Sequence, residues 1–331
     1  MAVTMAEITK LRHLTSAGLM DCKKALAETN GDIDAAVEIL RKKGQAIAAK
    51  REDREASEGC VLAANDKDFA AIVALKCETD FVAKNATFVD LTKKILDAAM
   101  ANRVKTIDEL KALELDGRSI ADLIVEESGK TGEKMELGAY ECLEAPSTTS
   151  YNHLGNKLST IVGFNLENVD YHVGRDVAMQ VASMNPVAVD REHVPAEVVE
   201  SERNVAIEKT KEEQVKRAVE VALKKAGINP NLCDTEAHIE SNIAKGWLTE
   251  DEAAKARVIA KEAAEAKAAN FPQAMIDNIA NGRVNKFYKE SCLMEQEFIK
   301  DGNLTIGKFL EQAAKGLVAC LLYTSDAADD A

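Results

Sequence analysis

The stretch FAAIVALKCETDFVAKN, residues 69–85, decides the fold of this chain. Its first nine residues are an apolar, partly β-branched run of strand length, which predicts a β-strand. Downstream, from Phe88 to Ala99, apolar residues recur at helical spacing. Residues 79–85 therefore lie where a strand ends and a helix follows.

Two interpretations of Asp80 and Phe81 follow from this position. Junctions between a strand and a helix lie at the surface and commonly carry binding residues, so a phenyl ring beside a carboxylate suits a probe inserted into another protein. Alternatively, Phe81 is a core residue and Asp80 caps the following helix. The local pattern leaves both interpretations open.

Around this stretch the sequence predicts an α+β core of two similar halves with antiparallel sheets. The strand at 69–77 is expected to pair with residues 60–64 across the turn Asn65-Asp66-Lys67-Asp68. The other expected core elements are helices at 87–101 and about 118–129, strands at 135–143 and 158–166 with a loop at 146–149 between them, and a helix at about 174–184.

Residues 5–44 read as three short helices separated by Gly18 and by Asn30-Gly31, with Gly44 in the position of a C-cap after the third. A bundle of this size resembles a ubiquitin-associated (UBA) domain, which binds partner proteins through a short apolar loop. Here that loop would be Leu19-Met20. Alternatively, both side chains pack inside the bundle. The charged segment at 45–58 reads as a linker.

Residues 196 to about 270 are rich in Ala, Glu and Lys and predict a protruding helical hairpin. Gly227-Ile228-Asn229-Pro230-Asn231 interrupts the helical pattern, and a capping box at Thr249–Glu252 restarts it. The hairpin serves either as a structural spacer or as an arm that binds a partner.

Composition excludes several classes of function. The 331 residues suggest two or three domains, and 42 Lys and Arg against 56 Asp and Glu give a formal charge of -14, which disfavours direct binding to nucleic acid. Seven scattered cysteines argue against a disulfide framework or a zinc site. The sequence has no signal peptide and no apolar run long enough to span a membrane, so we expect a cytoplasmic protein.

The chain also lacks a recognisable catalytic constellation. None of its 17 glycines forms a phosphate-binding loop, and nothing singles out any of its five histidines as a catalytic base. We therefore expect neither an enzyme nor a bound cofactor or metal. The function has to be exerted on a partner.

Residues 75–85, LKCETDFVAKN, resemble the core motif of the bacterial translation elongation factor Ts family. Other blocks that resemble the family follow in the family's order and span most of residues 5–310: AGLMDCKKAL at 17–26, NGDI at 30–33, DVAMQVA at 176–182, EVVE at 197–200 and GRVNKFY at 282–288.

This resemblance implies a guanine-nucleotide exchange factor. Its partner would be elongation factor Tu, a GTPase that holds GDP with Mg²⁺, bound in its GDP-bound and nucleotide-free states. The residues implied to dislodge the Mg²⁺ are Thr79, Asp80, Phe81 and Val82. The residues implied to contact the partner are Leu19, Met20, Lys23, Lys24, Lys84 and Gln180. A different reading is a non-exchanging adaptor or chaperone that binds through the UBA-like module, and dimerisation is left open.

The resemblance also suggests how the chain is divided. The expected parts are the UBA-like module at 5–44, the linker at 45–58, a first core half at 59–140, a second core half at 141–208 and 269–316, an inserted hairpin at 209–268 and an atypical tail at 317–331. In the tail, residues 326–331 look like an addition rather than a folded element, so we expect the family's last core strand to be missing or replaced.

Overall fold

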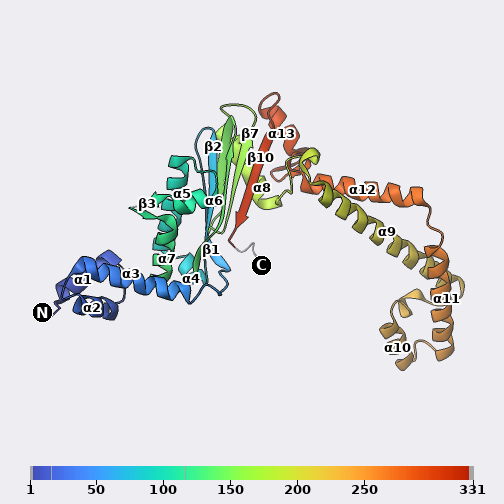
Figure 1. The fold of residues 1–331 in the computed structure, drawn as a ribbon. Helices are drawn as coiled ribbons and strands as arrows, with labels where there is room; N and C mark the ends of the chain where they lie inside the picture. The colour runs from blue at the N-terminus through green and yellow to red at the C-terminus, as the bar shows by residue number, and fades with distance from the viewer. Residues whose placement is uncertain (1–2, 16, 116, 328–331) are drawn as a thin grey trace. The chain divides into compact units, whose positions relative to one another are not determined.

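The computed structural model describes residues 3–15, 17–115 and 117–327. The chain divides into two compact units, one formed by Met1–Val189 with Gln296–Ala331 and the other by Asp190–Glu295. The first unit contains an N-terminal helical bundle and two antiparallel three-stranded sheets, and the second is helical (Figure 1). The predicted α+β fold is confirmed.

The N-terminal bundle consists of α1 (Met5–Thr15), α2 (Leu19–Glu28) and α3 (Ile33–Ala49). Asn30 and Gly31 both have positive φ, at 55° and 90°, which reverses the chain between α2 and α3. The Asp32 carboxylate then caps α3 by accepting the N–H of Ala35 at 3.1 Å. The bundle closes around a small core of apolar side chains: Ile8, Leu11, Cys22, Ala25, Leu26 and Ala36.

The third helix does not end at Gly44, as the sequence predicted, but continues to Ala49. Gly44 lies where α3 crosses α7 (Ile120–Thr131), and a Cβ atom on Gly129 of α7 would be only 2.3 Å from the Gly44 Cα. The glycine is thus explained by close approach of two helices rather than by helix termination. The bundle is joined to the core through this crossing.

The core has two sheets. The first has the order β1-β2-β5 and consists of β1 (Glu58–Asn65), β2 (Phe69–Cys77) and β5 (Met135–Glu144). The second has the order β10-β7-β6 and consists of β6 (Ser147–Asn152), β7 (Leu158–Phe164) and β10 (Ala319–Asp326). The predicted hairpin of β1 and β2 is confirmed.

Every residue of β2 is buried, because both faces of the first sheet are covered. Alternate side chains, including Val73 and Leu75, pack in the cluster that contains Phe88 of the neighbouring helix. Those between them, including Ile72, pack in the cluster that contains Ile161 of β7 in the second sheet. Burial on both faces accounts for the continuous apolar run.

Helices complete the layers. The helices on the outer face of the first sheet are α5 (Ala86–Asn102), α6 (Ile107–Ala112) and α7, while α8 (Tyr171–Met184) packs on the second sheet (Figure 1). The one-turn helix α4 (Asp80–Ala83) joins β2 to α5. Smaller elements are β3 (Glu114–Leu115), β4 (Arg118–Ser119), β8 (Glu297–Phe298), β9 (Asp301–Thr305) and α13 (Ile306–Ala313).

Two core predictions were wrong. Residues 147–149, expected as a loop, begin β6, where the hydroxyl of Thr148 donates to the carbonyl of Asp66 at 2.6 Å. The tail also forms a strand, since β10 pairs with β7 and extends the second sheet. Asp326 and Ala327 thus belong to the folded part, while residues 328–331 lie outside the described residues. A final core strand is therefore present.

The second unit contains α9 (Ala196–Lys225), α10 (Glu236–Ala244), α11 (Glu250–Ala268) and α12 (Gln273–Ser291). The long α9 packs against both α11 and α12, and the predicted capping box of Thr249 and Glu252 is confirmed at the start of α11. The expected boundary between residues 208 and 209 falls inside α9. A separate apolar cluster containing Leu223, Ile239 and Leu248 closes one end of this unit.

Candidate partner-binding site

The one-turn helix α4 presents Phe81 to solvent. This side chain is 84% exposed, whereas Ala83 on the same turn is 6% exposed and packs into the core. Val82 is half-buried. Asn85 ends the turn and starts α5, because its side-chain oxygen accepts the N–H of Thr87 at 3.0 Å. The interpretation of Phe81 as a core residue is therefore wrong.

Asp80 begins α4 and forms an ion pair with Lys84 at 2.6 Å. The hydrogen bond from Lys84 holds the pKa of the Asp80 carboxyl below its usual range, so this group is negatively charged near neutral pH. Both side chains are exposed, and an exposed pair of this kind contributes little to stability.

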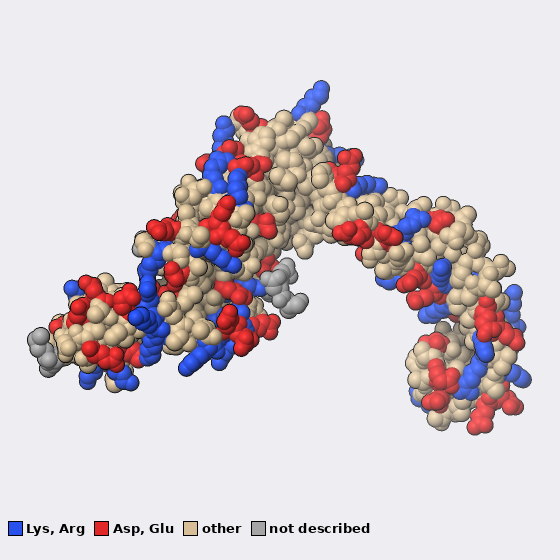
Figure 2. All heavy atoms as spheres, viewed as in Figure 1, with Lys and Arg blue, Asp and Glu red and all other residues tan. Residues whose placement is uncertain are grey.

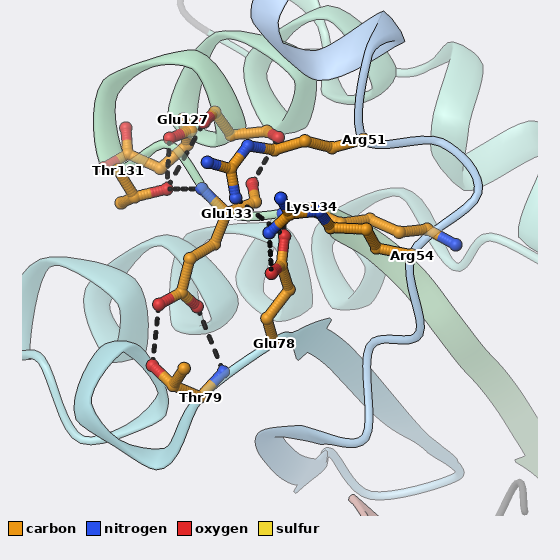
Figure 3. A network of polar contacts seen from close by, with 9 residues as sticks. Arg51, Arg54, Glu78, Thr79, Glu127, Thr131, Glu133 and Lys134 are labelled. Carbon is orange, nitrogen blue, oxygen red and sulfur yellow. Dashed lines mark hydrogen bonds and ion pairs between the residues drawn. The ribbon is translucent and has the colours of Figure 1, made fainter.

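A polar network fixes the residues just before α4 (Figure 3). The Glu133 carboxylate accepts the N–H of Thr79 at 3.0 Å and its hydroxyl at 2.7 Å. The neighbouring Glu78 carboxylate accepts from Arg51 at 3.1 Å, Arg54 at 2.9 Å and the N–H of Lys134 at 2.6 Å. Arg51 and Arg54 lie in the linker after α3, so this network joins the linker, the end of β2 and the loop before β5.

Glu78 is strongly stabilised in its charged form. Burial by itself would raise the pKa of its carboxyl, but the hydrogen bonds from the Lys134 N–H, Arg54 and Arg51 outweigh that effect and lower the pKa to about 2. The carboxylate consequently remains ionised over the whole physiological range.

The predicted anchor in the N-terminal bundle lies at the start of α2. Leu19 and Met20 are 42% and 59% exposed, so the alternative that both pack inside the bundle is wrong. Lys23 and Lys24, one turn later, are also exposed. The nearby Leu14 of α1 is exposed as well and was not predicted.

Gln180, predicted as a partner contact, has no exposed surface. Its side-chain amide donates to the Gln296 side chain at 3.2 Å and to the Glu297 carbonyl at 3.1 Å, and its oxygen accepts the N–H of Ile299 at 2.9 Å. These bonds tie α8 to the segment that contains β8. The predicted contact is therefore corrected to a structural position within the core.

The turn between β6 and β7 presents an exposed side chain that was not predicted from the sequence. Leu154 is 95% exposed, and Lys157 in the same connection forms an ion pair with Glu58 at 2.8 Å. After the hydrogen bond from Lys84, the charge of Lys157 also helps to lower the pKa of Asp80, so this turn and α4 lie at the same end of the core. The sequence did carry a signal for this exposed turn, because an apolar residue precedes Gly-Asn between two strand patterns.

The visible face of each unit carries Lys and Arg residues interspersed with Asp and Glu (Figure 2). Such a mixed surface differs from the clustered positive charge by which proteins bind a phosphate backbone. Within the described residues, no helix combines the length and the apolar character that crossing a bilayer demands.

Comparisons with known proteins show the family to which the chain belongs. A family model described as Elongation factor TS matches residues 78–222 and 213–326. An elongation factor Ts of Phocaeicola vulgatus is 60% identical over 95% of this chain and 95% of its own length. The corresponding protein of Parabacteroides distasonis is 58% identical over 94% of each chain, and that of Porphyromonas gingivalis is 45% identical over 96% of this chain and 95% of its own. The chain belongs to the elongation factor Ts family.

Proposed function

We propose that this chain is a guanine-nucleotide exchange factor for elongation factor Tu, acting in the cytoplasm during translation elongation. The observation that carries the proposal is Phe81, which is 84% exposed on a one-turn helix whose ends are fixed to the core. Exposing a large apolar side chain on a rigid element is typical of a residue that fills a pocket in a partner.

In this proposal α4 acts as a wedge against the nucleotide site of the GTPase. Mg²⁺ requires near-ideal octahedral oxygen geometry and bridges to the nucleotide phosphates. A small shift of an element that supports the ion therefore weakens the binding of both the ion and the nucleotide. The Phe81 ring supplies the displacement by repacking neighbouring helices of the partner. The charged Asp80 adds a hydrogen-bond acceptor beside it, with Thr79 and Val82 completing the segment.

Thermodynamic linkage sets a condition on this mechanism. If the chain weakens GDP binding by some factor, GDP must weaken binding of the chain by the same factor. The chain therefore binds nucleotide-free elongation factor Tu more tightly than the GDP-bound form, and incoming GTP expels it. The exposed Leu19, Met20, Lys23 and Lys24 hold the GTPase at a second point.

The test is the release rate of a fluorescent GDP analogue from elongation factor Tu, measured with excess unlabelled nucleotide and increasing concentrations of the chain. We expect the rate to rise and then saturate. A rate equal to spontaneous release at every concentration overturns the proposal.

One alternative is supported by a separate observation. Leu14, Leu19 and Met20 expose apolar surface on the N-terminal bundle, which suits an adaptor or chaperone that binds partners without exchanging nucleotide. Binding to elongation factor Tu with no change in the GDP release rate would favour this alternative.

A further inference from the structure

We infer that Glu133 is a positioning residue for exchange: by holding Thr79, its carboxylate fixes the start of α4 and thereby the direction in which Phe81 projects. This inference rests on the proposed function. Glu133 lies 54 residues away from Thr79 in the sequence, and its carboxylate accepts both hydrogen bonds from Thr79 (Figure 3). Its effect on a partner is transmitted through α4.

By itself, α4 cannot hold its orientation. It has four residues, and helices of so few residues are unstable by themselves because nucleation is unfavourable. Phe81, its largest side chain, points to solvent and adds little packing that could fix the turn. The direction of α4 is therefore set by the packing of Val82 and Ala83 on the core and by what holds its first end.

Glu133 holds the first end of α4 firmly. Its two carboxylate oxygens accept separately, one from the Thr79 N–H at 3.0 Å and the other from the Thr79 hydroxyl at 2.7 Å. A charged acceptor that binds two donors of one residue restricts both the backbone and the side chain of that residue. In return the Thr79 carbonyl accepts the N–H of Ala83 at 3.1 Å, which closes the turn of α4.

Glu133 is itself held in place. Gly132, with φ of 73°, ends α7 in the left-handed conformation. The Thr131 hydroxyl accepts the N–H of Glu133 at 3.3 Å, and the buried Ser128 hydroxyl donates to the Glu133 carbonyl at 2.5 Å. The N–H and the carbonyl of Glu133 are thus both bound to the end of α7, so the carboxylate starts from a fixed backbone. Figure 3 shows the bond with Thr131.

The experiment measures the affinity of the full chain for nucleotide-free and for GDP-bound elongation factor Tu and takes the ratio of the two dissociation constants. By linkage, this ratio equals the factor by which the chain weakens GDP binding. A variant that only unfolds part of the protein lowers both affinities equally and leaves the ratio unchanged. The ratio therefore separates positioning from general destabilisation.

Glu133→Gln is the main variant, because the neutral amide accepts the Thr79 N–H but can meet the Thr79 hydroxyl only as a donor, so the charge-assisted bond from that hydroxyl to a carboxylate is lost. We expect the ratio to fall about tenfold, the effect of losing one hydrogen bond to a charged group. Thr79→Ser keeps both donors and is expected to retain the wild-type ratio. Glu136→Gln is the matched control, since that carboxylate pairs with Lys134 at 3.1 Å in the same segment.

Phe81→Ala provides the decisive background. If Glu133 acts by directing Phe81, then adding Glu133→Gln to Phe81→Ala should leave the ratio unchanged from that of Phe81→Ala alone. A Glu133→Gln ratio equal to wild type, or a full tenfold loss in the Phe81→Ala background, overturns the inference while the proposed function stands. A wild-type chain with equal affinity for both forms of the GTPase overturns the proposed function itself.

Discussion

The helices α4 and α2 both present exposed apolar side chains, but they are held in different ways. Phe81 stands on one turn that is fixed to the core by Glu133 and by the buried Ala83. Leu19 and Met20 begin a ten-residue helix in a small separate bundle. Only an element that binds two states of a partner unequally can shift the balance between them. Under the proposed function, we expect α4 to discriminate between the states of the partner and α2 to contribute general affinity.

The largest expected effect tests the α4 side of this comparison. Replacing Phe81 by alanine should lower the maximal GDP release rate about 30- to 140-fold, because burial of a Phe side chain is worth roughly 2–3 kcal/mol. The concentration of chain that gives half of that rate should change much less. Stopped-flow release of a fluorescent GDP analogue measures both quantities.

The folding control for this variant is thermal unfolding. Phe81 is 84% exposed, so the midpoint should match wild type, whereas Phe88→Ala should destabilise the core by about 3–5 kcal/mol because Phe88 is 1% exposed. A lowered midpoint for Phe81→Ala would show that its side chain has a structural role.

The double variant Leu19→Ala/Met20→Ala tests the α2 side. We expect the half-saturating concentration to rise about fivefold to tenfold, from the loss of two partly exposed apolar side chains, with little change in the maximal rate. Met5→Ala, which removes another exposed apolar side chain of the same bundle, serves as the control. A reduced maximal rate would instead give α2 a share in discrimination.

The crossing of α3 and α7 joins the bundle that contains α2 to the core, so a variant at this crossing tests how the two regions are connected. Gly129→Ala should lower the free energy of unfolding by about 1–3 kcal/mol, because its Cβ would meet the Gly44 backbone at 2.3 Å. Gly282→Ala in α12, where nothing lies within 4 Å, should instead stabilise by up to about 1 kcal/mol. Urea unfolding measures the free energy of unfolding of both variants and so distinguishes a loss of stability from a gain.

A further expected effect concerns acid. Hydrogen bonds lower the pKa of Glu78 from its ordinary 4.5 to about 2, so its ionised form stabilises the fold above pH 4.5 and that stabilisation is lost as the pH falls toward 2. Over this window the wild type should lose more unfolding free energy than Glu78→Gln does. Parallel losses in urea titrations of both proteins would show that the network around Glu78 adds no stability.

The local pattern predicted much of the fold and part of the site. The apolar run of β2, its hairpin with β1 and the capping box at Thr249 depend on neighbours in sequence, and all three were correct. An exposed Phe81 was one of two interpretations. The local pattern could not predict contacts between segments that are distant in the sequence. Examples are the crossing at Gly44 and the burial of Gln180 against residues 296–299.

The same limit explains the strand predictions that failed. Residues 147–149 are polar and follow a proline, which locally favours a loop, but pairing with β7 satisfies their backbone. Likewise, Glu133 gave no signal as a site residue, since its importance comes from Thr79, which lies far away in the sequence.

The most direct test of the central claim compares GDP release from elongation factor Tu in millimolar Mg²⁺ and after chelation of the ion, each with and without saturating chain. If α4 acts by displacing Mg²⁺, the chain should accelerate release strongly when the ion is present and much less once it has been removed. Phe81→Ala should lose most of the Mg²⁺-dependent part. An acceleration of equal size under both conditions would contradict displacement of the ion, and no acceleration under either would contradict exchange.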